Sequence, residues 1–256
     1  MQIIEAFKYG NRFEIEYILE KILNKDKLFL HLNPNYRFNE KVFLEIINLR
    51  KKNYPLEYIF NEVFFYGEKF YIKEGVLIPR DDTEPLIDIA LKELQPNTTI
   101  AEIGVGSGVI SIILAKKLQA NFIATDINPI ALEVTQKNMK LHNVNIKLYL
   151  TNLLDNVNEN IDFIISNPPY VEEDWEYEPL KYEPKEAIFT KDKGTFLLKQ
   201  IVIEGIKRKV KKIICEMGYN QRELMKDFFI KQGIKDFYFY KDLSGNDRGF
   251  VVKLHH

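Results

Sequence analysis

The sequence has little of several features that would narrow its function at once. Its one cysteine, Cys215, cannot form an internal disulfide, and the apolar run around it predicts a buried, inert strand residue. No run of about 18 or more apolar residues occurs, so we expect no membrane-spanning helix. The first residues alternate charged and apolar side chains and lack the continuous apolar core of a signal peptide, and we therefore expect a cytoplasmic protein.

An excess of charge of one sign is also lacking. The chain carries 36 basic and 37 acidic residues, which gives a net charge of −1. This balance excludes a basic surface over the whole molecule and purely electrostatic binding of nucleic acid, although a local basic patch is still compatible with it. We expect no stable nucleic-acid binding, no metal site, no membrane contact and a monomeric state.

The N-terminal part of the chain has a helical pattern. Apolar residues recur three or four positions apart over residues 1–52, and Asn33-Pro34-Asn35 interrupts the pattern. We predict a small helical bundle with a structural or partner-binding role. Residues 63–72 are rich in aromatic and β-branched side chains, with Gly67 and Glu68 as the turn, which predicts a β-hairpin within a linker over 53–80.

Residues 81–256 alternate apolar strand segments with helical segments. We expect strands over 99–105, 121–127, 146–150, 161–166, 211–216, 237–241 and 249–254, and helices over 109–118, 129–141, 193–208 and 221–232. Such alternation predicts an α/β fold with a mostly parallel seven-stranded sheet and helices on both faces. The last two strands follow each other without a helix, so one of them should run antiparallel.

A glycine-rich loop, Gly104-Val105-Gly106-Ser107-Gly108, joins the first of these strands to its helix. Its glycines let the backbone turn sharply and approach a ligand closely. Free N–H groups at the helix N-terminus, beyond the carboxyl end of a strand, suit a nucleotide-like cofactor. A dinucleotide-binding loop has the form G-x-G-x-x-G, but here the third glycine comes two residues after the second, which argues against NAD.

Asp126 ends the second strand, where a carboxylate can accept hydrogen bonds from both hydroxyls of a ribose. The alternative is a helix cap before Pro129, a role that Asp126 or Asn128 could fill. Together with the glycine loop, Asp126 resembles the cofactor site of the Rossmann-like class I methyltransferases, which use S-adenosylmethionine and release S-adenosylhomocysteine.

That resemblance implies further cofactor contacts. In those enzymes the acidic residue before the loop, here Glu102, lies near the methionine part of the cofactor. A polar residue and an apolar neighbour after the third strand, here Asn152 and Leu153, meet the adenine edge and the adenine ring. The alternative for these two residues is an ordinary loop.

Asn167-Pro168-Pro169-Tyr170 follows the fourth buried strand. The two prolines fix the backbone and remove two N–H donors, so the alternative is a rigid turn with Tyr170 as a core aromatic. The Asn167 side-chain oxygen and the Pro168 carbonyl can accept both N–H bonds of a planar amide or aromatic amine, which directs the nitrogen lone pair at a sulfonium methyl group. We predict that Asn167, Pro168 and Tyr170 are catalytic, that all four residues bind substrate, and that Asn167 also meets the cofactor.

The four-residue motif occurs in adenine-amine and in glutamine-amide methyltransferases, so other segments must decide between them. These are Pro55-Leu56-Glu57-Tyr58-Ile59, residues 75–84, residues 182–187 and residues 215–221. In order along the chain they resemble the bacterial protein-glutamine methyltransferases that modify peptide chain release factors. Asp81 departs from the family, which usually has proline there. Two of these segments also have structural interpretations. Arg80 and Glu84 could form an ion pair, and residues 182–184 could simply order a loop.

The resemblance implies methyl transfer from S-adenosylmethionine to the side-chain amide nitrogen of the glutamine in the Gly-Gly-Gln motif of release factors. It also implies that the helical bundle, residues 1–52, helps to dock that protein on the methyltransferase domain, residues 81–256. Glutamine methylation of a ribosomal protein and adenine methylation of nucleic acid stay open. A binding module without activity is a further alternative, against which the intact loop and motif argue.

Overall fold

The computed structural model describes residues 1–173 and 180–255. The chain divides into two compact units, Met1–Asn61 and Glu62–His256. The predicted boundary at residue 52 and the linker over 53–80 stay predictions, and the hairpin itself falls within the second unit. In the described ranges, no helix is long and apolar enough to cross a membrane.

The first unit is helical, as predicted. Its elements are α1 (Ile3–Ala6), the 3-10 turn η1 (Phe7–Tyr9), α2 (Arg12–Leu23), α3 (Lys27–Leu32), α4 (Lys41–Arg50) and α5 (Leu56–Phe60). Two caps begin helices where the sequence offers short polar side chains: Asn11 accepts the Phe13 N–H at 2.9 Å, and Asp26 accepts the Phe29 N–H at 2.8 Å. The helices enclose one apolar core, made by Ile3, Ala6, Ile15, Ile18, Leu19, Leu30, Phe43, Ile46 and Ile47.

The second unit begins with a two-stranded hairpin and continues as an alternation of strands and helices. Its elements are β1 (Glu62–Phe65), β2 (Glu68–Tyr71), η2 (Asp81–Thr83), α6 (Glu84–Glu93), β3 (Thr99–Ile103), α7 (Val109–Lys117), β4 (Asn121–Asp126), α8 (Pro129–His142), β5 (Lys147–Leu150), β6 (Phe163–Ser166), β7 (Val171–Glu172), η4 (Lys185–Ala187), β8 (Phe189–Thr190), α9 (Phe196–Arg208), β9 (Lys212–Glu216), α10 (Arg222–Lys231), β10 (Asp236–Lys241) and β11 (Asp247–Lys253).

Seven strands form one sheet in the order β10-β11-β9-β6-β3-β4-β5. β3 pairs parallel with both β4 and β6, and β6 pairs parallel with β9. β11 runs antiparallel to both of its neighbours, β9 and β10. The predicted α/β class, with its mostly parallel sheet and its antiparallel strand, is confirmed.

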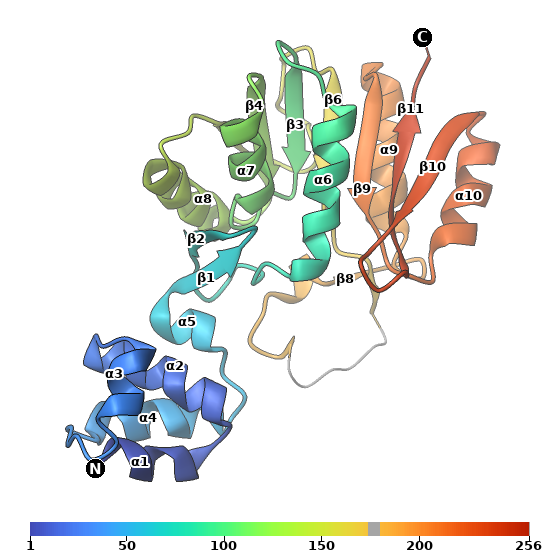
Figure 1. Ribbon diagram of the computed structural model, residues 1–256. Coiled ribbons are helices and arrows are strands. Elements are labelled where there is room, and N and C mark those ends of the chain that lie inside the picture. Colours follow the sequence, from blue (N-terminus) through green and yellow to red (C-terminus); the bar gives the residue numbers. More distant parts are fainter. Residues whose placement is uncertain (174–179, 256) are drawn as a thin grey trace. The chain divides into compact units, whose positions relative to one another are not determined.

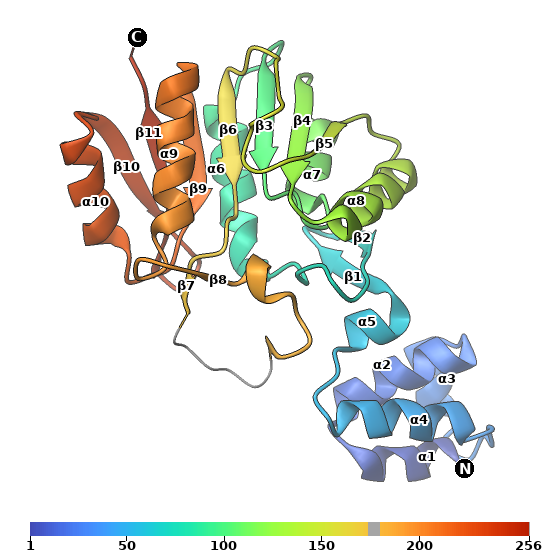
Figure 2. The ribbon, with the colours of Figure 1, turned by 180° about the vertical axis from the view of Figure 1, so that it is seen from behind.

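Helices cover both faces of this sheet (Figures 1 and 2). α6 and α7 lie in front of the sheet in Figure 1, and α9 and α10 lie on the opposite face, which Figure 2 brings to the front. The apolar residues of α9 and α10 pack on β6, β9 and β11 in a cluster that includes Leu198, Ile201, Phe229, Ile164 and Phe250. Burial on both faces explains why the central strands are continuous apolar runs.

The strand order reverses between β3 and β6, and this position determines where a ligand can bind. From β3 the chain proceeds to β4 and β5 on one side, and then crosses to β6 and β9 on the other. Ligands of doubly wound sheets bind in the crevice that such a reversal leaves beyond the carboxyl ends of the strands. The glycine loop follows β3 and Asn167 follows β6, so the two features found in the sequence meet at this crevice.

The hairpin differs from its prediction by one residue at the turn. Phe65 pairs with Glu68, so the turn consists of Tyr66 and Gly67 and not of Gly67 and Glu68. Both turn residues have positive φ, 52° and 74°, as a two-residue hairpin turn with the right twist requires. The α6 residue Glu84 accepts the Tyr66 N–H at 2.8 Å, which helps to hold tyrosine in this less common conformation.

Candidate functional site

The glycine loop is held in shape by the elements on either side of it. The N–H groups of Gly104 and Val105 both donate to the Thr125 carbonyl of β4 at 2.9 Å. On the α8 side, Thr135 donates to the Gly106 carbonyl at 3.0 Å. A loop fixed by so many bonds presents a preformed surface to a ligand.

The three glycines of the loop serve two purposes. Gly104, Gly106 and Gly108 have φ of 74°, 55° and 84°, a region that other residues adopt at an energetic cost. A Cβ at Gly104 or Gly106 would meet nothing within 4 Å, whereas a Cβ at Gly108 would come within 2.8 Å of Thr135 Cγ2. The first two glycines therefore leave open space in front of the backbone, and the third lets α7 approach α8.

Asp126 is tied to the loop, and a neighbour fills the capping role. One Asp126 oxygen accepts the Gly106 N–H at 3.0 Å, and the other accepts the Asn128 N–H at 2.9 Å. Asn128 itself caps α8, because its side chain accepts the Ile130 N–H at 2.9 Å. Asp126 therefore does not cap the helix. Its carboxylate keeps further lone pairs for a ligand.

A cleft of about 850 Å³ opens at this crevice, next to the glycine loop. Six of the ten predicted cofactor residues line it: Gly104, Gly106, Asp126, Asn152, Leu153 and Asn167. Asn152 and Leu153 therefore belong to a cavity wall and not to an unrelated loop. This volume includes the solvent at the open mouth of the cleft.

The charges around the cleft favour a cationic ligand. Among the described residues that line it, the charged ones are Asp126 and Glu186, and both are acidic. Burial raises the pKa of Asp126 above its ordinary value, and the neighbouring Glu186 carboxylate adds to this effect. The hydrogen bonds from the N–H groups of Gly106 and Asn128 act in the opposite direction. A pyrophosphate would meet two carboxylates here, whereas a ligand with a positive group and ribose hydroxyls fits these negatively charged acceptors.

The other four predicted cofactor residues shape the loop without lining the cleft. Val105, Ser107 and Gly108 are buried, and the Ser107 carbonyl accepts a hydrogen bond from Asn138 at 2.8 Å. Glu102 is 1% exposed, and one of its oxygens accepts both the N–H group, at 2.9 Å, and the hydroxyl of Ser111. Its other oxygen is buried and has no hydrogen-bond partner in the described part of the chain. Burial raises the pKa of Glu102 to about 8, although the two hydrogen bonds from Ser111 lower it.

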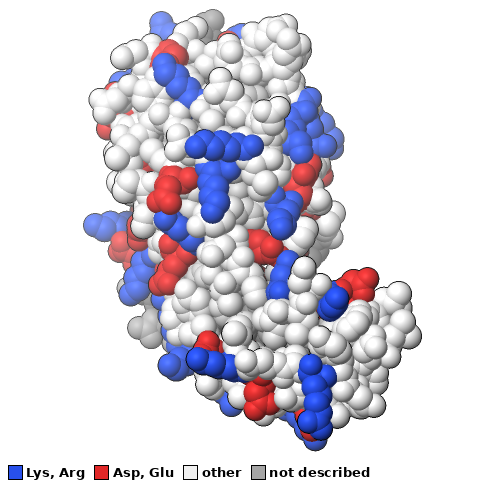
Figure 3. All heavy atoms as spheres, turned by 90° about the vertical axis from the view of Figure 1, so that its left-hand side faces the viewer, with Lys and Arg blue, Asp and Glu red and all other residues white. Residues whose placement is uncertain are grey.

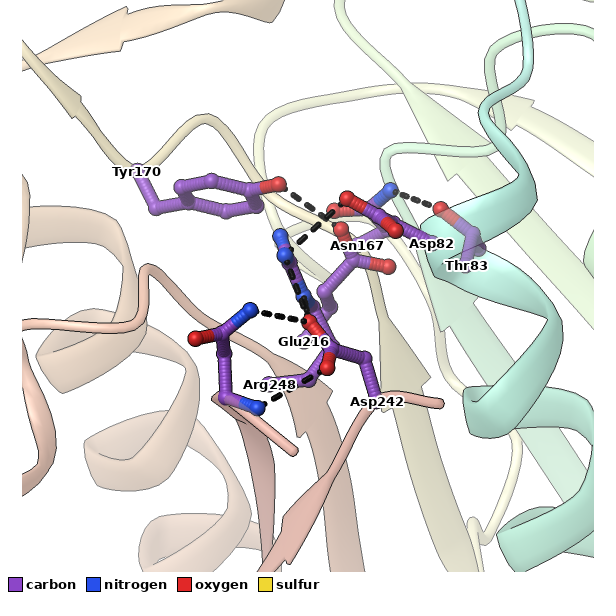
Figure 4. A network of polar contacts seen from close by, with 8 residues as sticks. Asp82, Thr83, Asn167, Tyr170, Glu216, Asp242 and Arg248 are labelled. Carbon is purple, nitrogen blue, oxygen red and sulfur yellow. Dashed lines mark hydrogen bonds and ion pairs between the residues drawn. The ribbon is translucent and has the colours of Figure 1, made fainter. Parts of the chain in front are cut away.

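The strand-end motif places Asn167 between two side chains. Its amide nitrogen, Nδ2, donates to the Thr83 hydroxyl at 3.0 Å, and Figure 4 shows this bond beside the end of η2. In residues 1–173 and 180–255, no donor is found hydrogen-bonded to the side-chain oxygen of Asn167 or to the Pro168 carbonyl. The two acceptors that the sequence predicted thus remain available to a substrate.

Tyr170 is anchored in a buried polar network (Figure 4). Its hydroxyl donates to Oε1 of Glu216, at the end of β9, at 2.8 Å. Burial raises the pKa of Glu216 to about 7, while the hydroxyls of Thr83 and Tyr170 and the positive charge of Arg248 act in the opposite direction. Arg248 forms ion pairs with Asp82 at 3.0 Å and with Asp242 at 2.9 Å. Tyr170 is therefore fixed at its hydroxyl, and the residue is half-buried.

A second cavity, of about 470 Å³, borders the same motif. Its walls include Asn167, Pro168, Pro169 and Tyr170, together with Leu77 and Arg80. Asn167, Pro168 and Pro169 also line the first cleft. The motif is therefore a wall that the two cavities share.

Segments distant in the sequence build the rest of this wall. Arg80 forms its ion pair with the buried Glu183, whose second oxygen accepts the Ile78 N–H at 3.0 Å. The suggested pairing of Arg80 with Glu84 is not formed. Gln221 donates to the Tyr170 carbonyl at 2.7 Å, and a Cβ at Gly194 would lie only 2.0 Å from that carbonyl oxygen. These contacts give structural roles to Glu183 and to Gln221, each of which belongs to a segment that the sequence singled out.

Sequence reasoning missed several residues of the cleft. Gly75, Val76 and Leu77 line it from before α6, and Pro184, Glu186 and Ala187 line it from η4. Asn128 fixes the first segment by donating to the Gly75 carbonyl at 2.8 Å. Ile127, which lines the cleft and is 60% exposed, carried a usable signal, because it is an apolar residue directly after the predicted ribose ligand. In the described ranges, no cluster of side chains suited to a metal ion is found.

Comparison with known proteins agrees with this geometry. The family described as "Methyltransferase small domain" matches residues 83–181. The chain is 34% identical to a release factor glutamine methyltransferase of Clostridium botulinum over 94% of this chain and 91% of that protein. It is 31% identical to a bifunctional methyltransferase of Rickettsia conorii over 93% of this chain, and it spans about half of that protein's length, 53%.

Solved structures agree on the fold. The Mtq2–Trm112 complex of E. cuniculi, described as responsible for the methylation of the eRF1 translation termination factor, aligns with a TM-score of 0.51. The alignment covers 70% of this chain and 99% of that chain at 19% sequence identity. At this identity the likeness supports the methyltransferase fold alone.

Proposed function

The chain belongs to the release factor glutamine methyltransferase family, and from that premise we propose that it methylates the glutamine of the Gly-Gly-Gln motif in peptide chain release factors. The methyl group comes from S-adenosylmethionine, and the acceptor is the side-chain amide nitrogen. The observation that carries the proposal is the shared wall: Asn167, Pro168 and Pro169 border both the acidic cleft and the second cavity. A donor in one cavity and an acceptor in the other can therefore meet at this common border.

The acidic cleft is the proposed cofactor site. We assign Asp126 to the ribose hydroxyls and Asn152 with Leu153 to the adenine, since all three residues line the cleft. The open space before Gly104 and Gly106 supports this assignment, because it admits a ligand against the backbone. When bound, S-adenosylmethionine supplies an electrophilic methyl group on a positively charged sulfur. The negative charge of Asp126 and Glu186 favours that cation over an anionic cofactor.

The second cavity is the proposed glutamine site. The amide N–H bonds of the substrate can donate to the Asn167 side-chain oxygen and to the Pro168 carbonyl, since no hydrogen bond to either is found among the described residues. These two bonds orient the nitrogen lone pair toward the methyl carbon, and they stabilise the positive charge that grows on nitrogen.

Transfer is then an in-line displacement. The nitrogen lone pair forms the new bond to the methyl carbon, the carbon–sulfur bond breaks, and its electron pair stays on sulfur. The nitrogen then loses a proton, which an N-protonated amide gives up readily to water. Tyr170, held at its hydroxyl by Glu216, offers its ring as a wall for the planar amide.

We propose further that the helical unit helps to dock the release factor. Three large apolar side chains on α2 and α3 are mostly exposed: Phe13 at 74%, Leu28 at 64% and Leu32 at 71%. We expect Leu32→Ser to raise the KM for release factor several-fold, with cofactor affinity unchanged, because an exposed apolar anchor would be lost without harm to the core. Leu243→Ser, at a position 99% exposed in the second unit, is the matched control. Equal KM values for the two variants would refute this role.

The experiment that tests the function compares acceptors. The full chain is incubated with methyl-labelled S-adenosylmethionine and, separately, with a release factor, a ribosomal protein fraction and nucleic acid. We expect label in the release factor and none when its Gly-Gly-Gln glutamine is replaced. Label in nucleic acid alone would refute the proposal, and label in the ribosomal fraction alone would redirect it to another protein glutamine. On the face shown in Figure 3, basic and acidic side chains are interspersed, which gives nucleic acid no continuous basic track there.

A further inference from the structure

The amide of Asn167 must be oriented in one of two ways, and only one of them serves the reaction. The oxygen and nitrogen of an asparagine amide are nearly equal in size, so shape alone does not select between them. With the oxygen toward the second cavity, Asn167 accepts a substrate N–H. With the nitrogen there, two donors would face each other and the substrate would lose an acceptor.

Thr83 lies close enough to Asn167 to influence the orientation of its amide, but the Thr83 hydroxyl alone does not determine that orientation. The Asn167 nitrogen donates to the Thr83 oxygen at 3.0 Å. A hydroxyl can donate or accept, so it could equally serve an asparagine oxygen turned toward it. The selection therefore depends on where the hydroxyl proton of Thr83 points.

Glu216 can determine where the hydroxyl proton of Thr83 points. It is 1% exposed at the end of β9 and, when ionised, offers acceptors only. One oxygen, Oε1, accepts the Tyr170 hydroxyl at 2.8 Å. The other, Oε2, is buried and has no hydrogen-bond partner in the described part of the chain. Figure 4 shows Thr83 and Glu216 within one polar network, and the Thr83 hydroxyl lowers the pKa of the carboxylate.

We propose that Thr83 and Glu216 are positioning residues, which fix the Asn167 amide with its oxygen toward the substrate and so set its catalytic orientation. The carboxylate draws the Thr83 proton toward itself, and the Thr83 oxygen is then left to accept from Asn167. Neither residue is among the described residues that line either cavity, and both are buried, Thr83 at 3% exposure. They act through Asn167, and Glu216 in addition holds Tyr170 at the other end of the motif (Figure 4). This inference rests on the proposed methyl transfer.

Two substitutions at Thr83 distinguish the effect of the hydroxyl group from the effect of the side-chain shape. Thr83→Val keeps the branched shape and removes the hydroxyl, whereas Thr83→Ser keeps the hydroxyl. At about pH 8, where Glu216 is ionised, we expect Thr83→Val to lower kcat by about tenfold to a hundredfold, with KM and S-adenosylhomocysteine affinity nearly unchanged. Thr83→Ser should restore kcat to within a few-fold of the parent. Glu216→Gln should lower kcat as Thr83→Val does, because its amide can donate to Thr83 and compete with Asn167.

A control and a double substitution test the route of action. Thr98→Val removes a buried hydroxyl that lies outside the site and donates to the Gln95 carbonyl, with an oxygen–oxygen distance of 2.6 Å. This variant reports the general effect of removing a buried hydroxyl. Asn167→Asp removes the amide nitrogen and keeps the acceptor oxygens, so Thr83→Val should lower kcat much less in that background than in the parent. The same factor in both backgrounds would overturn the inference, as would a Thr83→Val enzyme with parental kcat or a Thr83→Ser enzyme as slow as Thr83→Val.

Failure of the inference can be told from failure of the proposed function. All variants are measured on release factor with the parent alongside. A parent that transfers no methyl to release factor refutes the function. A parent that is active, with variants that do not follow the predicted order, refutes only the positioning role.

Discussion

Glu102→Gln probes a carboxyl group that the fold buries beside the cofactor loop. The carboxyl group is 1% exposed, and one of its two oxygens has no hydrogen-bond partner in the described ranges. Burial raises its pKa from 4.5 to about 8, in spite of the two hydrogen bonds from Ser111. The native protein therefore keeps this group protonated at pH values where the unfolded chain has released the proton.

The sign and size of the pH effect follow from this difference. Because the native pKa lies above the unfolded value, the contribution of Glu102 to stability is fully present below about pH 4.5 and is lost as the pH rises through about 8. A pKa difference of about 3.5, at about 1.36 kcal/mol for each unit, corresponds to on the order of 5 kcal/mol. The amide that replaces the carboxyl group in Glu102→Gln does not titrate, so the variant should escape this loss.

Urea unfolding of the parent and of Glu102→Gln at several pH values between about 4.5 and 8.5 measures the effect. We expect the free energy of unfolding of the variant, relative to the parent, to increase by several kcal/mol across this range. Glu93→Gln is a control of opposite sign: burial raises the Glu93 pKa, but the stronger effect of its bonds to Lys212 and Tyr238 lowers it overall. That variant should lose most stability above about pH 4.5 and less as the pH falls below that value, so its measurements extend into acid below pH 4.5. A Glu102→Gln difference that does not change with pH would refute the reasoning.

The remaining predictions concern the two ligands. Asn167→Ala removes one of the two acceptors for the substrate amide and should lower kcat by about 10²-fold to 10³-fold, while calorimetry finds S-adenosylhomocysteine affinity reduced less; full activity would remove Asn167 from the mechanism. Asp126→Ala removes a carboxylate placed for the ribose hydroxyls and should weaken S-adenosylhomocysteine binding by about tenfold to a hundredfold, since hydrogen bonds to a charged group contribute about 1.5–3 kcal/mol. Unchanged affinity in that variant would assign Asp126 to the loop alone.

The sequence was most informative where local pattern and strand order agree. The strand ends at Gly104, Asp126, Asn152 and Asn167 could be predicted to meet, because the carboxyl ends of parallel strands share one edge of the sheet. Helix α6 is absent from the predicted elements, although its apolar residues at 86, 87 and 90 after Pro85 have helical spacing. That helix had a usable local signal.

Other parts of the site had no local signal. The bond between Thr83 and Asn167 joins positions 84 residues apart, and that between Ile78 and Glu183 joins positions 105 apart. No spacing rule links such pairs, because their contact depends on how η2 and the loop before η4 pack on the sheet. Glu102 is a further case: its position in the sequence predicts that it lies near the cofactor, but not that its carboxylate accepts hydrogen bonds from Ser111. Local sequence specifies the elements, whereas the orientation of a side chain depends on its tertiary neighbours.

The most direct test of the central claim locates the transferred methyl group. Release factor is incubated with the full chain and S-adenosylmethionine, digested, and analysed by tandem mass spectrometry, with Asn167→Ala as the parallel enzyme control. The account predicts one added methyl group on the side-chain amide nitrogen of the Gly-Gly-Gln glutamine, and no modification with the variant. A methyl group on any other residue, or an equally modified peptide with Asn167→Ala, would contradict it.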